Sequence, residues 1–371
     1  MRNLFKNYIY PISTLAGTII GVGFFALPYV ASKVGVGIML AYFLILGSLV
    51  ILIHLIFGQL SLKTPDHKRL PGFAKMYLGK GGEAVAFIST ILGIFGALLA
   101  YLIVGGEFLE NLFSPIFGGS NSIYTIFYFS LGAILIFFGI KAISRIEFWA
   151  LVSFFIILFT LFLRGIPDFQ IINLFAPSDL TQLFLPYGII LFSLWGIDLI
   201  PEVEEMIRER KKLLPVIILI SILIASAVYL FFTFWVLGIT GSQTTESALV
   251  GLKNYLGNGM MALGFLFGAL TTFTSFIAVG LTLRNIFWYD LKMNKTAAWF
   301  ITCSIPFFLF FLGVKRFIPV ISLTGGLFIG INGILILLMY KKVFPQKRFL
   351  VLPLILLLFA GIIYEIIYFV K

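Results

Sequence analysis

Long apolar runs, divided by short polar segments, occupy most of the chain. A helix needs about 20 mostly apolar residues to cross a bilayer, and this length predicts eleven spans. The polar segments between the spans contain glycines and prolines that are typical of turns, as at Gly35, Pro65 and Pro167. The predicted spans are residues 8–31, 36–62, 83–113, 122–140, 146–163, 182–202, 213–238, 259–283, 297–314, 318–339 and 349–370.

Composition supports an all-α polytopic membrane protein. Hydrophobic residues make up 61% of the 371 residues and charged residues 11%, with a mean hydropathy of +1.11. A soluble domain of this length could not cover so much apolar surface. The first apolar run is too long for the core of a signal peptide, so we expect the first span to be retained. The lipid bilayer is therefore an expected partner, and no feature of the sequence specifies an oligomeric state.

The net charge of +11 is placed where a membrane protein carries it. With the N-terminus inside, 20 of the 26 lysines and arginines fall in cytoplasmic segments and six fall outside. Such an excess is typical of cytoplasmic loops, and Lys315–Arg316 is its main exception. We expect a multi-pass protein of the plasma (inner) membrane with a cytoplasmic N-terminus and an extracytoplasmic C-terminus. No nucleic-acid partner is expected.

Residues for metal or covalent chemistry are scarce. Cys303 is the single cysteine and lies in an apolar span, while His54 lies in the second span and His67 in a basic loop. These positions give no cluster of the kind that holds a transition metal. No His-Glu-x-x-His motif or glycine-flanked serine is present. We expect neither an enzyme nor a bound organic cofactor.

The first span contains a weak point, Gly17-Thr-Ile-Ile-Gly21-Val-Gly23. Each glycine costs roughly 1 kcal/mol relative to alanine in a helix. Backbone groups freed by an interruption cannot face lipid, because nothing in hydrocarbon would bond to them. They must face protein, a ligand or a water-filled cavity. Close packing of two helices is the alternative use of such glycines.

A second weak point lies in the sixth span. Ser193 to Gly196 fall near its middle, and Asp198 and Pro201 follow. An aspartate within a span is costly unless it faces protein or water, so it marks a candidate functional site. The alternative is that Asp198 lies in the cytoplasmic interface.

The two weak points occupy matching positions in two groups of five spans. Because five is odd, the second group inserts with the opposite orientation. An inverted repeat with two interrupted helices points to a transporter site at the bilayer midplane. We expect one transport domain over residues 1–371, with repeats at 8–163 and 182–339 and a peripheral eleventh helix at 349–370.

Four segments resemble the amino acid–polyamine–organocation superfamily. Gly17–Gly23 followed by Leu27-Pro28 resembles its first helix, and Phe192-Ser-Leu-Trp-Gly-Ile-Asp198 resembles its second discontinuous helix. Leu70-Pro-Gly and Ile197-Asp-Leu-Ile-Pro-Glu are similar to its amino acid/auxin and aromatic amino acid permease branches. The resemblance covers roughly residues 8–340. It implies a LeuT-type fold, with discontinuous first and sixth helices, and secondary active transport of amino acids.

Helix ends at the two breaks supply partners for both charges of a zwitterion. A helix N-terminus offers free N–H groups and about half a positive charge, which suits a carboxylate. A glycine lets the ligand approach the backbone closely. We expect the substrate carboxylate at the N–H groups of Gly21, Val22 and Gly23, and the ammonium at carbonyls of Thr18 or Ile19 and of Phe192 and Ser193.

Three aromatic side chains are further candidates for the substrate site. Tyr101 lies near the centre of the third span, where related transporters place a tyrosine that binds the carboxylate. Phe192 and Trp195 are expected to close over the substrate side chain. Ordinary packing or an interfacial position is the alternative for all three.

The eighth span resembles the sodium-binding segment of LeuT-type carriers. The resemblance implies a sodium site made by the hydroxyls of Thr274 and Ser275 and the carbonyls of Gly17, Ile20 and Thr271. Hydroxyls in a span also satisfy themselves on the preceding turn. Proton-coupled relatives often carry a lysine in the fifth span, and 150–162 contains none. Sodium is thus the expected coupling ion; protons are the alternative, with Asp198, Glu107 or Glu365 as carriers.

The charged run from Glu202 to Lys212 predicts an inner gate, in which its acids pair with Arg2, Lys6 or Arg145. A solvated helix end is the alternative. We also expect a short surface helix over residues 70–79 and either a lid or a connector over 240–258. A sensor that binds amino acids without transporting them is the alternative from another class, but such sensors usually carry a long soluble tail.

Overall fold

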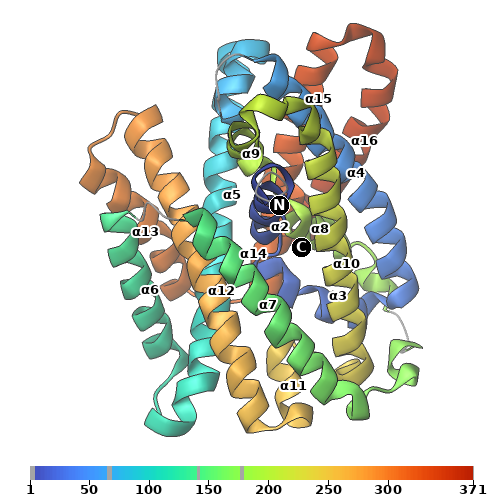
Figure 1. Ribbon diagram of the computed structural model, residues 1–371, viewed down its shortest axis with the longest axis vertical. Coiled ribbons are helices and arrows are strands. Elements are labelled where there is room, and N and C mark those ends of the chain that lie inside the picture. Colours follow the sequence, from blue (N-terminus) through green and yellow to red (C-terminus); the bar gives the residue numbers. More distant parts are fainter. Residues whose placement is uncertain (1–4, 65–68, 140–142, 176–178, 371) are drawn as a thin grey trace.

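A computed structural model describes residues 5–64, 69–139, 143–175 and 179–370, and it shows helices and connecting turns throughout these ranges (Figure 1). This agrees with the all-α class predicted from the apolar runs. The α-helices are α2 (Tyr10–Ile19), α3 (Leu27–Val34), α4 (Val36–Lys63), α5 (Leu70–Phe117), α6 (Asn121–Phe138), α7 (Ile143–Gly165), α8 (Pro186–Leu194), α9 (Ile200–Met206), α10 (Leu214–Thr240), α11 (Leu249–Leu256), α12 (Asn258–Asn285), α13 (Lys295–Phe311), α14 (Phe317–Leu323), α15 (Gly330–Val343) and α16 (Arg348–Val370).

Most of the predicted spans correspond to helices of sufficient length. Among the described residues, nine helical segments are long and apolar enough to cross a membrane, and one bent pair joins residues Asn7–Ile19 and Val22–Val34 at 55°. The predicted span 297–314 is met by α13, whose 17 residues make it shorter than a typical span. The predicted number of eleven spans therefore exceeds the nine or ten that length and composition support.

Both predicted interruptions are present. In the first span α2 ends at Ile19, Gly21 is extended (φ −109°, ψ −155°), and a 3-10 turn, η2, begins at Val22. In the sixth span α8 ends at Leu194, and Trp195 is extended (φ −79°, ψ 123°) before η6 (Ile197–Leu199) and α9. The discontinuous first and sixth helices of the prediction are confirmed.

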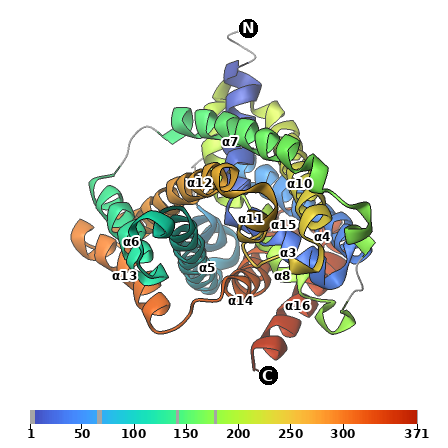
Figure 2. The same ribbon diagram turned by 90° about the horizontal axis from the view of Figure 1, so that it is seen from below.

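The broken helices lie inside the bundle, between longer helices. The half-helix α2 packs against α10 and α7, and α8 packs against α4 and η10 (Thr324–Ile329). On the other side α12 packs against α5, α6 and α7. Seen from below, α3 and α11 lie near the centre of the bundle (Figure 2). Since α11 also packs on α7, α10 and α12, it covers that end of the molecule.

The two predicted surface segments both have regular structure. Residues 70–78 form the first part of α5, and Gly79 (φ 80°, ψ −168°) separates them from the spanning part. The predicted short helix is thus present and is joined to the third span. In the segment 240–258, α11 buries Leu249, Leu252 and Leu256 against the bundle. It is therefore a packed cover and not a solvated connector.

The sixth and tenth spans meet backbone to backbone. A Cβ added to Gly325 would overlap the Gly188 carbonyl, and one added to Gly188 would overlap the Ser322 carbonyl. Small residues allow membrane helices to approach this closely. The contact joins α8 to η10, a π-helical segment of the tenth span. It therefore holds α8, the first half of the broken sixth helix, in place.

We predict that Gly325→Ala lowers stability by about 1–3 kcal/mol, the usual cost of overpacking, because its methyl group meets backbone that cannot move aside. Gly81→Ala is the matched control, since no atom lies within 4 Å of its added Cβ. The control should be neutral or stabilising by up to about 1 kcal/mol. Thermal unfolding of the purified variants in detergent measures both, and equal midpoints would contradict the packing assignment.

Candidate functional site

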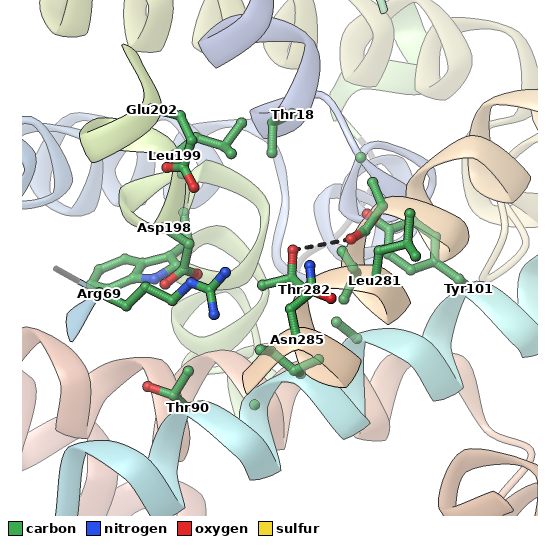
Figure 3. Close-up of a pocket in the computed structure, with 18 of the residues that line it drawn as sticks. Thr18, Arg69, Thr90, Tyr101, Asp198, Leu199, Glu202, Leu281, Thr282 and Asn285 are labelled. Atoms are coloured by element: carbon green, nitrogen blue, oxygen red, sulfur yellow. Dashed lines mark hydrogen bonds between the residues drawn. The ribbon is translucent and has the colours of Figure 1, made fainter. Parts of the chain in front are cut away.

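A cavity of about 750 Å³ lies where the two broken helices meet (Figure 3). Its walls come from both breaks, from α5 and from α12. Residues of the first break and sixth span that line it include Thr18, Ile19, Gly21, Val22, Gly23, Phe192, Ser193, Trp195 and Gly196. Every residue predicted to bind the substrate, Tyr101 included, therefore lines one cavity.

The two breaks touch each other through glycine. A Cβ on Gly23 would overlap the Ser193 hydroxyl, and a Cβ on Gly196 would lie 2.6 Å from the Ile19 side chain. Each break thus contributes a glycine that accommodates a residue of the other break. Larger side chains at Gly23 or Gly196 would separate the two helix interruptions. This explains physically why both interruptions carry glycine.

Tyr101 brings the third span to the first break. A Cβ on Gly21 would lie 2.7 Å from the Tyr101 hydroxyl oxygen. The same hydroxyl interacts with the backbone N–H of Val22 and with the side chain of Ser275 on α12. Tyr101 therefore stands beside the N–H groups expected to receive a carboxylate. Gly21 itself donates its N–H to the Ile19 carbonyl at 2.7 Å.

Tyr229 joins the two breaks and was missed by the sequence analysis. It lies on α10, is 0% exposed, and its hydroxyl donates to the carbonyls of Ile19 and of Ser193, the latter at 2.9 Å. These are carbonyls predicted to receive the substrate ammonium. The Thr18 hydroxyl, by contrast, donates to the Thr14 carbonyl one turn back at 2.9 Å.

His54 is the second residue that the sequence analysis missed. It is fully buried on α4, its Nε2 accepts the backbone N–H of Gly196 at 3.0 Å, and its Nδ1 lies 2.8 Å from the Val50 carbonyl. Nδ1 must therefore carry the proton, since it faces an acceptor. The ring also makes an edge contact with Trp195 at 5.4 Å. His54 thus binds a backbone group that the second break has freed.

His54 and Tyr229 occupy equivalent positions in the two halves. His54 follows Ile20 by 34 residues (54 − 20), and Tyr229 follows Trp195 by 34 residues (229 − 195). Each lies on the helix after a broken span and reaches into the break of the opposite half. This equal spacing of polar side chains in apolar spans is the sequence signal that could have identified both.

Charged side chains line one end of the cavity. Arg69 and Asp198 lie close together, with Glu202 on the same side of the cavity (Figure 3), and the charge of Arg69 acts on both carboxyls. Asp198 is exposed to the cavity space although protein surrounds it. Arg284 and Lys295 line the same cavity. All five lie at the end of the bundle that the predicted orientation places in the cytoplasm.

Arg284 fixes part of this end. Its guanidinium donates to the carbonyls of Ile136 and Phe137 at the last turn of α6 and to the Asn285 side chain at 3.1 Å. Free carbonyls at a helix C-terminus favour a cation. Arg284 therefore joins α12 to α6 at the wall of the cavity. The residue as a whole is 5% exposed.

The proposed sodium ligands Thr274 and Ser275 make their described contacts within α12 and with Tyr101. The Thr274 hydroxyl is exposed and donates to the Thr271 carbonyl at 3.0 Å within α12. Ser275 lies against Tyr101. Gly17 has nothing within 4 Å of an added Cβ, and the Ile20 N–H bonds back to Ala16. The helix that carries Gly17 packs on α10 and α7 rather than along α12.

The remaining predicted acids lie away from the breaks. Glu107 lies on α5 near Glu110 and Glu246, outside the cavity. Glu365 is 0% exposed on α16 and accepts the Ser322 hydroxyl at 2.9 Å. Neither lines the cavity, so of the three candidate proton carriers only Asp198 does.

One ion pair of the predicted inner gate joins two residues of the same charged run, Glu202 to Lys212. Glu204 is 1% exposed, accepts the Ser61 hydroxyl and pairs with Lys211 at 2.7 Å. Arg2 and the side chains of Lys6 and Arg145 lie outside the described residues. Glu202 faces Arg69 instead. The Glu204–Lys211 ion pair thus joins α9 to the turn that follows it.

Known proteins with similar sequences and structures include several transporters. The model of the tryptophan/tyrosine permease family matches residues 6–369. A tyrosine-specific transport system of Haemophilus influenzae is 27% identical over 72% of this chain and 70% of its own, and a glutamine transporter of Aliivibrio fischeri is 22% identical over 84% and 82%. The crystal structure of MhsT with L-phenylalanine superposes with a TM-score of 0.73 at 14% identity, covering 95% of this chain and 98% of that one. This likeness agrees with the predicted LeuT-type fold.

We predict that His54→Phe lowers stability by about 1–3 kcal/mol, the cost of leaving the buried Gly196 N–H without an acceptor. His54→Gln places an amide oxygen near the position of Nε2, whereas His54→Asn places one near Nδ1. Gln should therefore retain more stability than Asn or Phe. Thermal unfolding of the three variants checks this order, and equal losses would show that the acceptor at Nε2 is not what matters.

Proposed function

This chain belongs to the tryptophan/tyrosine permease family, and from that premise we propose that it carries an aromatic amino acid across the plasma membrane by alternating access, with sodium as the coupling ion. The chain is an amino acid transporter and not an enzyme. One observation carries the proposal. Two interrupted helices and Tyr101 border the same cavity, at the place where free backbone groups of both signs are found.

The proposed binding mode uses helix ends for both charges of the amino acid. The carboxylate would accept hydrogen bonds from the N–H groups of Val22 and Gly23, at the start of η2, and from the hydroxyl of Tyr101. The ammonium would donate hydrogen bonds to the carbonyls of Ile19 and Ser193. Partial charges at helix termini are suited to such ions, and they act strongly where water is excluded. No side-chain charge is needed at the centre of the membrane.

An aromatic substrate side chain suits the cavity next to the breaks. Phe192 and Trp195 line it from the sixth span, and Gly93 and Ala97 leave room on α5. Aromatic rings gain from edge and offset contacts with one another. The tyrosine-specific transport system of Haemophilus influenzae and the phenylalanine bound to MhsT support this choice. The glutamine transporter of Aliivibrio fischeri argues against it, because glutamine has a polar side chain.

Alternating access is proposed from the single open end. The lining residues include Arg69, Met206 and Lys295 from connections at one end of the bundle, and α11 packs over the opposite end. The predicted orientation makes the open end cytoplasmic, so this conformation would be inward-facing. Substrate would enter when α11 and its neighbours part, and leave through the charged end.

Sodium coupling is proposed from the hydroxyl-bearing face of α12. Thr271, Thr274 and Ser275 are spaced so as to share that face, and Ser275 already lies against Tyr101 at the substrate cavity. In the conformation described, the Thr274 hydroxyl donates to the Thr271 carbonyl within α12. We propose that the full ligand set assembles when the cytoplasmic end closes and α2 approaches α12. Such an arrangement would release the ion in the open state.

We predict that proteoliposomes containing the protein accumulate labelled L-tyrosine, and that an inward sodium gradient increases uptake. Thr274→Ala should remove the sodium dependence, because it deletes one proposed ligand. Tyr101→Phe should weaken tyrosine binding roughly tenfold, the value of a charge-assisted hydrogen bond. Glu83→Gln is the control, since Glu83 pairs with the exposed Lys75 and does not line the cavity, and it should leave uptake unchanged. Uptake that ignores sodium would refute the coupling ion while leaving the substrate intact.

Proton coupling is the second candidate, favoured by the position of Asp198. This carboxyl faces the cavity beside Arg69, where it can reach water. If a pH gradient drives uptake instead, we predict that Asp198→Asn abolishes concentrative uptake but retains exchange of labelled for unlabelled tyrosine. Thr274→Ala would then be silent. Measuring both variants under each gradient separates the two candidates, and loss of exchange in Asp198→Asn would show a role in binding instead.

A further inference from the structure

Tyr229 holds the carbonyls that the proposed function assigns to the substrate. Its hydroxyl donates to Ile19 at the end of α2 and to Ser193 near the end of α8. The two acceptors are 174 residues apart in the chain (193 − 19). A single phenol group therefore sits where both helix interruptions expose oxygen atoms.

We propose that in the empty carrier the Tyr229 hydroxyl takes the place of the substrate ammonium as the donor to the carbonyls of Ile19 and Ser193, and that the ammonium of the amino acid takes over these carbonyls on binding. Tyr229 thereby sets how strongly the carrier prefers amino acids to deaminated analogues. The inference rests on the proposed function, because it requires that the carbonyls of Ile19 and Ser193 bind the substrate.

Counting protons supports the exchange. A phenol has one proton to donate, whereas two carbonyl oxygens lie within its reach. An ammonium group has three N–H donors and a full positive charge. It satisfies both carbonyls together and can also donate to the phenol oxygen. The phenol proton and the Gly21 N–H, which the Ile19 carbonyl accepts at 2.7 Å, serve the two carbonyls when the site is empty. An ammonium supplies stronger, charge-assisted donors to both.

Burial explains why the empty site needs a substitute. Tyr229 is 0% exposed, Ser193 is 2% exposed, and Ile19 is 2% exposed. Carbonyl groups buried without a donor are costly, above all inside a membrane. The phenol meets this cost after the substrate leaves, from α10 and outside the lining of the cavity. The carrier can then complete its cycle without substrate in the site.

The test compares two ligands that differ by the ammonium group, L-tyrosine and 3-(4-hydroxyphenyl)propionate. Their dissociation constants are measured by calorimetry on the full-length protein in nanodiscs, for the wild type and Tyr229→Phe. Tyr187→Phe is the matched control, since the buried Tyr187 hydroxyl also donates to a carbonyl of another helix, Leu358, at 3.1 Å. Tyr187 does not line the cavity.

Removing the Tyr229 hydroxyl should strengthen the binding of L-tyrosine without changing that of the deaminated analogue. We expect Tyr229→Phe to bind L-tyrosine about three- to tenfold more tightly, the worth of one hydrogen bond, and the analogue as before. Tyr187→Phe should change neither constant. Equal changes for both ligands would mean that Tyr229 is structural. Selectively weaker binding of L-tyrosine would make it a direct ligand, and either result overturns the proposal.

A second variant covers the case in which Tyr229→Phe fails to fold. Incorporating 3-fluorotyrosine at position 229 keeps the ring and the hydroxyl but makes the phenol a stronger donor. The variant should bind L-tyrosine severalfold more weakly and the analogue as before, a change opposite in sign to that of Tyr229→Phe. An unchanged ratio of the two dissociation constants overturns the proposal.

If the wild type binds no amino acid, the proposed function fails and the inference with it. If it binds and the ratios do not move, only the inference fails.

Discussion

Backbone groups inside a membrane must be bonded, and this requirement governs the centre of the molecule. Interrupting two spans frees carbonyl and N–H groups at a depth where lipid offers no partners. Tyr229 from α10 meets the carbonyls of Ile19 and Ser193, and His54 from α4 meets the Gly196 N–H. The helix that follows each broken span thus supplies a side chain that bonds to the break of the other half. The breaks therefore depend on neighbouring helices as well as on their own glycines.

The same constraint explains why the cavity is polar at one end and nearly neutral at its centre. Near the breaks the polar groups are dipoles of helix ends and hydroxyls of tyrosine, which cost less to bury than full charges. Full charges appear at the mouth, where Arg69, Asp198 and Glu202 face one another. A zwitterion passing from the mouth to the centre exchanges water and side-chain charge for oriented backbone.

The apolar pattern and the positions of glycine predicted most of the fold, because length, hydropathy and helix-breaking residues are local properties. Both interruptions followed from Gly17–Gly23 and Ser193–Gly196, whereas cavity residues of other elements, such as Arg69 and Thr282, did not. The span count did not follow as well, since α13 is short and the first span is bent. Tyr229 and His54 were missed because their partners are 210 and 142 residues away. Such contacts depend on how helices pack, and no local pattern reports that.

The interleaving of the two halves has a consequence for biogenesis. The Ile19 carbonyl accepts the local Gly21 N–H and a second donor from a helix synthesised some 210 residues later. The first half-helix therefore enters the lipid with a hydrogen bond that only a subsequent insertion event completes. Until α10 arrives, water or the translocation machinery can supply that second donor. Each half of this carrier therefore depends on the other half to complete the hydrogen bonds at its own break.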